Sequence, residues 1–410
     1  MISVFTPSHN PKWLDECYRS LFEQTNPNWE WIVVLNGDAK WKAPDDARIK
    51  TYRLEGNRGV GYYKREAVNW CTGDIILELD HDDYLLPDAL SLVEWVFDRY
   101  PNVGFVYSDC AQINEDGTPN DEEFDPFYGW TYYTQDGFKV ANSFEPHPHN
   151  VGYIWYAPNH LRAFRYKAYR DIAGYDPNLY ICDDQDLMSR LYKETEFYHI
   201  KECLYLQRIH GENTQSKPDI NPQIQSLTVD LYQRDIQQMA VKWADSNDLL
   251  SLDLGSYHNK AEGFLGVDLR PGPGVDIVDD FLDLDLAPNS VGVIRAHDFM
   301  EHIENKIAFI EKAYDLLAHG GMLLSMTPST DGRGAFQDPT HVAFYNEHSF
   351  WYYTDKNYAN FIDTYVRFQV STLRTFFPSQ WHAENNVPYV QANLIALKAE
   401  GRDFGGLLSI

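Results

Sequence analysis

The stretch NRGVGYYKREAVNWCTGDIILELDHDDYLLPDAL, from Asn57 to Leu90, decides the fold of the first part of the chain. Its basic residues read as one face of a helix, and DIILELD predicts an apolar strand that ends in an acidic cluster. Pro87 then stands where a first helical residue often does, and PDALSLVEWVFDRY continues with apolar residues at helical spacing. Helix and strand therefore alternate, which is typical of an α/β domain with a parallel sheet.

The same alternation extends outward on both sides. ISVFTP and WIVVLNG predict two strands around a helix near residues 13–24, and VGFVYSD predicts a further strand. Residues 114–156 interrupt the pattern with Gly, Pro, Asp, His and aromatic residues, which indicates long loops over a site. DDQDLMSRLYKE then predicts a helix and ECLYLQRIH a strand.

A second alternation follows the polar segment NTQSKPDINPQ. A helix over about residues 223–244 leads to the strands LLSLDLGS, GFLGVDLR and SVGVIRAHD, a helix in ENKIAFIEKAYDLLAHGG, and an antiparallel pair in RFQVSTLRTFF and YVQANLIALK. We therefore expect a first domain over residues 1–218, a linker and helix over 219–248, and a second domain over 249–410.

Charge and cysteine content restrict the functions to consider. The 410 residues carry a formal net charge of -27, which opposes a sequence-independent grip on nucleic acid because such binding needs many Lys and Arg contacts to phosphates. The five cysteines show neither zinc-ligand spacing nor a disulfide framework. The chain opens directly on a strand-like run and contains no stretch long enough to span a bilayer, so we expect a cytoplasmic protein without stable membrane insertion.

Asp80, His81, Asp82 and Asp83 follow an apolar strand. Carboxylates so close together repel one another unless they share a cation, and hard oxygen ligands suit Mn²⁺ or Mg²⁺. The alternative is that they cap the helix that starts near Pro87. Both interpretations stay open on these residues alone.

The stretch from Asn57 to Leu90 resembles the signature of family 2 glycosyltransferases of the GT-A fold. ISVFTPSHN and WIVVLNGD resemble the first two strands of that family, and AGYDPNLYICDDQDLMSRL resembles its later acidic catalytic segment. The resemblance covers nearly all of residues 1–215. It implies a Rossmann-like GT-A domain that transfers a hexose or pentose from a nucleotide sugar to a hydroxyl acceptor. The expected donor is a UDP-sugar, and the expected transfer inverts the anomeric carbon.

The resemblance also implies roles for single residues. Asp80 and Asp82 match the DxD pair that holds the metal and the donor diphosphate, and His210 matches a histidine that completes the metal site. Asp184 matches the general base, with Asp183 before it. The positions that match donor-binding residues are Pro7, Asn36, Asn57, Lys64, Arg65, Asp80 and Arg208. Asn36 stands where the family has an acidic residue, which leaves the nucleobase open, and Lys64 and Arg65 also fit a solvated helix face.

The segment EPHPHNVGYIWYAPNHLRAF contains four side chains that suit an acceptor site: His147, His149, Trp155 and His160. Aromatic rings offer a broad apolar face with a polar edge, which suits sugar rings or bases. They suit the packing of a loop equally well.

In the second domain, LLSLDLGSYHNKAEGFLGVDLR, HDFMEHI and DLLAHGGMLLSMTP resemble class I S-adenosylmethionine (SAM)-dependent methyltransferases over about residues 249–398. The resemblance implies a Rossmann-like domain in which Gly255 and Asp268 contact SAM. Tyr257 departs from the pattern, because a second glycine usually follows the first, and its ring would restrict the turn or fill the cofactor space. An active methyltransferase and a degenerate, structural domain both remain open.

The leading hypothesis is thus an inverting, metal-dependent glycosyltransferase fused to a methyltransferase-like domain, acting on a glycan, a glycolipid or a small molecule. Alternatives are a bifunctional glycosyltransferase and methyltransferase, a glycosyltransferase acting on hydroxymethylated DNA bases, and a binding scaffold. The residues leave the donor sugar, the acceptor, the linkage and the oligomeric state open.

Overall fold

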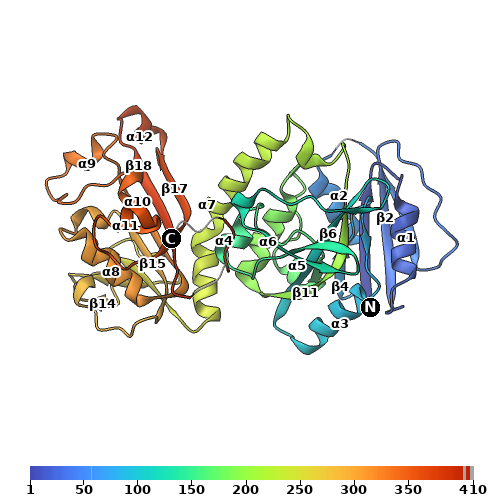
Figure 1. The fold of residues 1–410 in the computed structure, drawn as a ribbon, viewed down its shortest axis with the longest axis horizontal. Helices are drawn as coiled ribbons and strands as arrows, with labels where there is room; N and C mark the ends of the chain where they lie inside the picture. The colour runs from blue at the N-terminus through green and yellow to red at the C-terminus, as the bar shows by residue number, and fades with distance from the viewer. Residues whose placement is uncertain (57, 400–402, 407–410) are drawn as a thin grey trace. The chain divides into compact units, whose positions relative to one another are not determined.

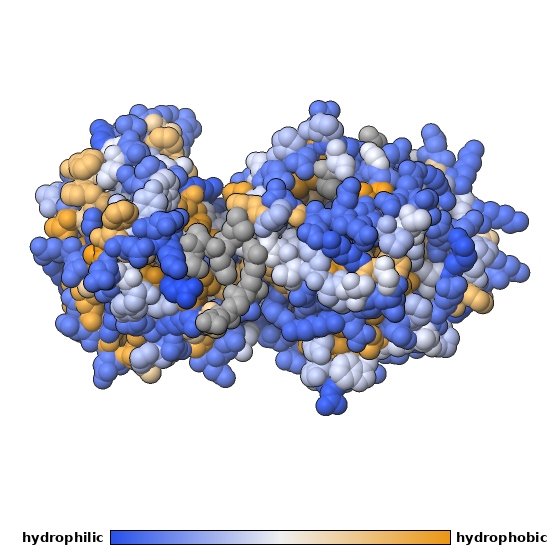
Figure 2. Space-filling view, in the orientation of Figure 1, coloured by the Kyte–Doolittle hydropathy of each residue, from blue (hydrophilic) through white to orange (hydrophobic). Residues whose placement is uncertain are grey.

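The computed structural model describes residues 1–56, 58–399 and 403–406. They form two compact units: one comprises residues up to 236 together with 403–406, and the other begins at residue 237. The boundary lies inside helix α7 (Asn221–Ser246), which covers most of the segment expected to be linker and helix. Figure 1 traces both units along the chain, and Figure 2 shows a mostly hydrophilic face on each, in keeping with the charge.

The first unit is built on a mixed sheet of eleven strands with the central order β3-β2-β1-β4-β10-β6-β11-β5. Strands β1 to β4, β6 and β11 run in parallel, and β10 runs antiparallel to both of its neighbours. The strands are β1 (Ile2–Ser8), β2 (Trp29–Asn36), β3 (Ile49–Leu54), β4 (Ile75–Glu78), β5 (Tyr84–Leu85), β6 (Val103–Asn114), β7 (Pro119–Asn120), β8 (Thr131–Gln135), β9 (Phe138–Asn142), β10 (Arg162–Arg165) and β11 (Glu196–Ile209). The predicted βαβ opening is confirmed.

Helices cover this sheet because apolar residues recur on one side of each. In α1, Leu14, Cys17 and Leu21 are buried at a spacing that places them on one face. Strand β2 is buried along nearly its whole length, as expected of a strand covered on both faces. The helices are α1 (Leu14–Phe22), α2 (Val60–Asn69), α3 (Ala89–Arg99), α4 (Pro148–Gly152), α5 (Tyr166–Asp171), α6 (Asp183–Glu194) and α7.

Two parts of the first unit differ from the sequence prediction. Residues 114–156, expected to be long loops, contain the hairpin of β8 and β9, which pairs with β6. Residues 403–406, expected in the second domain, belong to the first unit because Phe404 is buried there. The Gly405 amide donates to the Asn150 side chain at 2.8 Å.

The second unit has a seven-stranded sheet with the order β14-β13-β12-β15-β16-β18-β17. The first five strands in this order run in parallel, and β18 runs antiparallel to β16 and β17, as the sequence predicts for the last two strands. The strands are β12 (Leu250–Leu254), β13 (Leu265–Asp268), β14 (Ile277–Val278), β15 (Val291–His297), β16 (Leu317–Pro328), β17 (Phe368–Phe376) and β18 (Tyr389–Ala396). The helices are α8 (Lys306–Leu316), α9 (Gly334–Gln337), α10 (Glu347–Thr354), α11 (Lys356–Ala359) and α12 (Gln380–Glu384).

Candidate active site

A cavity of about 720 Å³ opens in the first unit where the parallel strands end. Pro7 on β1, Asn36 at the end of β2 and Asp80 just after β4 all line it. Ligands of open α/β sheets bind at this edge. The other lining residues that bear on its chemistry are Lys64, Asp82, Asp83, Trp155, His160, Arg162, Asp183, Asp184 and His210.

Asp82 and His210 stand together at one side of the cavity. The Nε2 atom of His210 lies 2.9 Å from Oδ2 of Asp82, and the ring of His210 stacks on Trp13 with centroids 4.8 Å apart. Asp80 stands just before Asp82 in the sequence. Its burial, followed by the charge of Glu78, raises the pKa of its carboxyl group to about 7. Carboxylate oxygens with one imidazole fit the donor set of Mn²⁺, and Asp82 and His210 supply one donor of each kind in direct contact.

Asp83 has a different environment. It accepts hydrogen bonds from the Arg208 amide at 2.7 Å and from the Tyr205 hydroxyl at 2.9 Å. One donor atom each of Asp80, Asp83 and His160 nevertheless lie within 4.8 Å of one another. Asp80 is thus grouped with Asp83 and His160, whereas Asp82 pairs with His210.

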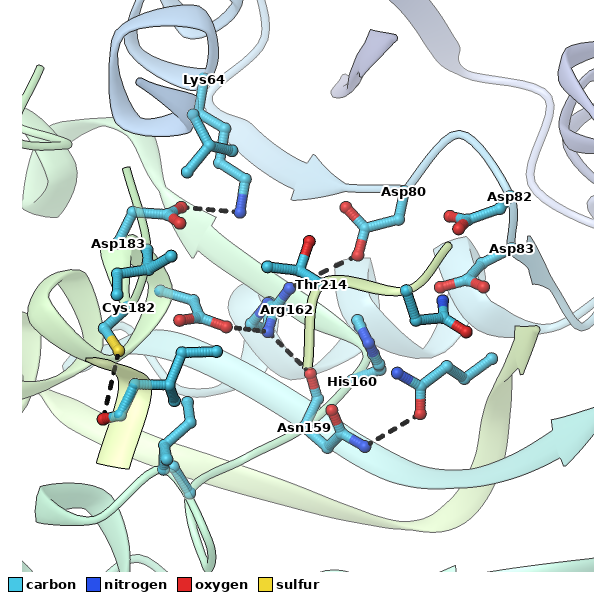
Figure 3. Close-up of a pocket in the computed structure, with 18 of the residues that line it drawn as sticks. Lys64, Asp80, Asp82, Asp83, Asn159, His160, Arg162, Cys182, Asp183 and Thr214 are labelled. Atoms are coloured by element: carbon cyan, nitrogen blue, oxygen red, sulfur yellow. Dashed lines mark hydrogen bonds and ion pairs between the residues drawn. The ribbon is translucent and has the colours of Figure 1, made fainter. Parts of the chain in front are cut away.

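A buried network of alternating charges lies beside the acidic cluster. Lys64 from α2 contacts Glu78 at 2.8 Å and Asp183 at 2.7 Å, and Arg162 from β10 contacts Glu78 at 2.8 Å and Asp184 at 2.9 Å. Burial lowers the pKa of Lys64, but Asp183 and Glu78 outweigh it, so the net effect is a raised pKa. Figure 3 shows the Lys64 and Asp183 pair on one side of Arg162, and Asp80 on the other.

The two aspartates that begin α6 differ in access to the cavity. The Asp183 side chain is 7% exposed and is paired with Lys64, whereas the Asp184 side chain is 22% exposed. Arg162 holds one oxygen of Asp184, and the other accepts the Gln185 amide at 2.8 Å. Asp184 is therefore the carboxylate of the pair that an incoming hydroxyl reaches more easily.

Two predicted donor-binding residues, Arg208 and Arg65, do not line the cavity. The Arg208 side chain is 1% exposed, and its guanidinium is taken up by Glu16 at 2.6 Å and by backbone carbonyls of Asp82 and Glu115. Arg65 points away from the lining and donates to the Tyr175 carbonyl at 3.2 Å, because it lies one position further around α2 than Lys64. Asn57 lies outside the described residues.

The predicted acceptor residues divide into two pairs. Trp155 and His160 line the cavity, and the His160 ring stacks on Tyr205 with centroids 4.2 Å apart. His147 and His149 are buried away from the lining, which corrects their assignment to the acceptor. His147 accepts the His149 amide at the start of α4, and His149 contacts the Gly405 carbonyl at 3.0 Å.

Sequence reasoning missed several residues that line the cavity or lie beside it. Arg162 and Glu78 are direct partners across the antiparallel strands β10 and β4. A charged residue inside the apolar strand DIILELD was a signal for Glu78, but nothing local pointed to Arg162. The aromatic residues Tyr128, Trp130 and Tyr180 also line the cavity. The only feature of the sequence that indicated them was the high aromatic content of 15%.

In the second unit, Gly255 follows strand β12, and Asp268 is the last residue of the neighbouring strand β13. Gly255 has a φ of +70°, a conformation that favours glycine, and its amide donates to the Val267 carbonyl at 2.9 Å. Asp268 accepts the Tyr257 amide at 3.3 Å. A Cβ atom on Gly255 would stand 3.0 Å from the Phe299 ring, so aromatic groups crowd this turn.

The first part of the chain is similar to known glycosyltransferases. Residues 3–170 match the family model described as glycosyl transferase family 2. A chondroitin synthase of Escherichia coli is 25% identical over 225 residues, which are 53% of this chain and 30% of that protein. A hyaluronan synthase of Pasteurella multocida is 24% identical over 229 residues, which are 53% of this chain and 21% of that protein.

Among solved structures, S. aureus TarS 1–349 in complex with UDP-GlcNAc is 15% identical, with a TM-score of 0.42, over 60% of this chain and 71% of that chain. The chain spans less than a third of the length of the two synthases. Within the ranges that the structure describes, no helix is both long and apolar enough to cross a membrane.

The sheet order and the position of the cavity define the first unit as a mixed α/β domain with its candidate site at the carboxyl ends of the parallel strands. More specifically, the part of the first unit from residue 3 to residue 170 is similar to glycosyltransferases of family 2.

Proposed function

We propose that the first unit transfers a sugar from a nucleotide sugar to a hydroxyl acceptor, with inversion at the anomeric carbon. The observation that carries the proposal is that one cavity contains both an acidic cluster with His210 and, from a separate helix, the accessible carboxylate of Asp184. The family 2 match over residues 3–170 supports the reaction class.

The donor is proposed to lie along the strand ends. Pro7 and Asn36 would border the nucleobase, and Asp80, Asp82 and His210 would hold a divalent cation on the diphosphate. Such a cation supplies Lewis-acid stabilisation of the leaving group. Asn36 offers both a donor and an acceptor to a base, so the donor screen begins with UDP-sugars and includes other nucleotides.

Asp184 is proposed as the general base. As the acceptor oxygen bonds to the anomeric carbon, its proton passes to Asp184, and the bond from that carbon to the diphosphate oxygen breaks. Arg162 would orient the base through its 2.9 Å contact with the Asp184 carboxylate. Asp183 is instead paired with Lys64. The rings of Trp130, Trp155 and Tyr180 offer apolar faces for an acceptor sugar.

A donor screen tests the proposal. Nucleotide-sugar hydrolysis is measured with Mn²⁺ and with EDTA, and products are identified by mass spectrometry. We expect release of a nucleoside diphosphate that depends on the metal and is lost in Asp82→Asn but kept in Asp88→Asn, an exposed aspartate outside the cavity. Equal turnover in EDTA would rule out the metal assignment.

A second candidate function concerns the second unit, for which we propose a methyltransferase-like domain with a narrowed cofactor site. Support comes from the strand order β14-β13-β12-β15-β16-β18-β17 and from Gly255 and Asp268 on adjacent strands. The Tyr257 ring packs on Gly272, and Phe299 crowds Gly255. In isothermal titration of the full chain with SAM, we expect no measurable binding by the unmodified chain and weak binding by Tyr257→Gly. Tight SAM binding by the unmodified chain would contradict the proposal that aromatic rings narrow the cofactor site.

A further inference from the structure

A cluster of three metal-binding side chains lies in the second unit, apart from the cavity of the first. Glu301 and His302 follow β15, and His341 follows β16. These strands are parallel neighbours, so all three residues lie at the carboxyl edge of the sheet, where ligands of open α/β sheets bind. One donor atom from each lies within 4.8 Å of the other two.

Backbone carbonyls orient both imidazole rings. The Nδ1 atom of His302 lies 3.1 Å from the Thr340 carbonyl oxygen, and Nδ1 of His341 lies 3.0 Å from the Ala335 carbonyl oxygen. Because a carbonyl only accepts, the neutral rings carry their proton on Nδ1 and keep a free lone pair on Nε2. Histidines that bind metals are typically held in this way, through the nitrogen that does not bind the metal.

Glu301 supplies a buried carboxylate that lacks a basic partner. Its side chain accepts the Thr327 hydroxyl at 2.7 Å, and no Lys or Arg among the described residues forms an ion pair with it. The residue is 2% exposed. A buried carboxylate is stabilised by a nearby cation, so this position favours metal binding.

The surrounding hydrogen bonds fix the three residues relative to one another. The Glu301 carbonyl accepts the amides of Val342 and Ala343, both at 2.9 Å, which ties the segment after His341 to Glu301. Asp338 accepts the Thr340 amide at 2.8 Å and the Thr340 hydroxyl at 2.6 Å. Asp338 therefore holds the residue whose carbonyl orients His302.

We propose that Glu301, His302 and His341 bind a divalent first-row transition-metal ion. Two imidazoles and one carboxylate suit Zn²⁺, Co²⁺ or Fe²⁺ better than Mg²⁺ or Ca²⁺, which prefer oxygen donors. Closing the three donor atoms to metal distances of about 2.0–2.2 Å asks each for a shift of less than about 1 Å. Three protein ligands leave at least one position open for an oxygen-bearing ligand.

Metal titration of the full chain tests this site independently of the glycosyltransferase proposal. Every variant carries Asp80→Asn and Asp82→Asn, so that both groups of potential metal ligands in the first unit lose a carboxylate. The metal-free chain is titrated with Zn²⁺, followed by calorimetry, and with Co²⁺, followed by its visible spectrum. We expect one equivalent of each ion and a Co²⁺ spectrum that reports nitrogen ligation.

Changes to the ligands should remove this binding. His302→Ala and His341→Ala should each weaken Zn²⁺ binding at least tenfold, and so should Glu301→Gln, which keeps the shape of the side chain. His348→Ala, which removes an exposed histidine of the same unit, should leave binding unchanged. Near-ultraviolet circular dichroism checks folding. Absence of Zn²⁺ and Co²⁺ binding in the chain with both aspartate changes, or unchanged binding in the ligand variants, would overturn the proposal.

Discussion

Replacing Glu78 by glutamine removes the negative charge at the centre of the buried network while nearly keeping the size of the side chain. Glu78 accepts hydrogen bonds from Lys64 and Arg162, both at 2.8 Å, and from the Tyr175 hydroxyl at 2.7 Å. The side chains of both cations are less than a tenth exposed, so water cannot take the place of the lost carboxylate. Removing one partner from a buried ion pair typically costs about 3–5 kcal/mol.

That cost is a large part of the free energy of unfolding of a typical domain, about 5–15 kcal/mol. At about 2–4 °C per kcal/mol for a domain of this size, Glu78→Gln should lower the Tm of the first unit by about 6–20 °C. Glycosyl transfer should fall as well, because Arg162 loses the partner that holds it beside Asp184. Calorimetric unfolding and initial rates at a temperature where the variant is folded measure the two effects separately.

Glu30→Gln is the matched control. Glu30 is also buried, but its basic partner Lys50 is 41% exposed and stays hydrated when the charge is removed. We expect a smaller loss of about 1–3 kcal/mol and unchanged transfer.

The pH dependence of the effect follows from the pKa of Glu78. Burial alone would raise it, but Arg162 and Lys64 outweigh burial and lower it below the ordinary 4.5. The stabilisation is therefore present above about pH 4.5 and is lost as the pH falls further. A variant within 1 kcal/mol of the unmodified chain at pH 7 would refute this account of the network.

The remaining predictions address other parts of the first unit. Asp82→Asn should abolish Mn²⁺-stimulated donor turnover with little change in Tm, and a turnover that stays metal-dependent would remove Asp82 from the metal site. Burial lowers the pKa of His199, but its 2.7 Å contact with Asp109 outweighs burial and raises the pKa above 6.5. Protonated His199 should therefore stabilise the chain by about 1–3 kcal/mol relative to His199→Gln, as measured by chemical denaturation. This stabilisation should be present below pH 6.5 and lost as the pH rises through the pKa of His199 in the folded chain. Gly405→Ala should lower the Tm, because the new Cβ atom would stand 2.2 Å from the Tyr156 ring, whereas an unchanged Tm would show that residues 403–406 are dispensable.

Sequence reasoning predicted the part of the site that strand ends determine. Asp80 and Asp82 follow one parallel strand and Pro7 lies on its neighbour, so their meeting at one edge of the sheet follows from topology. Lys64 and Asp184 were predicted from their positions in the motifs that resemble family 2 glycosyltransferases. Both residues line the same cavity in the structure.

The rest of the site depends on contacts between distant segments. Arg162 meets Glu78 through the register of β10 on β4, which no local pattern encodes. Arg208 lies near the acidic cluster, as expected, but Glu16 and the backbone occupy its guanidinium. His147 is buried beside Phe404, from a segment that the sequence assigned to the other domain.

The central claim is tested most directly by comparing the unmodified chain with Asp184→Asn at saturating Mn²⁺. Donor binding is measured by calorimetry, and product formation by mass spectrometry with the donor and acceptor that the screen identifies. We predict that Asp184→Asn binds the donor as tightly as the unmodified chain does but forms product about 10²–10⁴ times more slowly, because only the proton acceptor has been removed. Undiminished product formation, or loss of donor binding with normal turnover of the bound fraction, would contradict the assignment of Asp184 as the base.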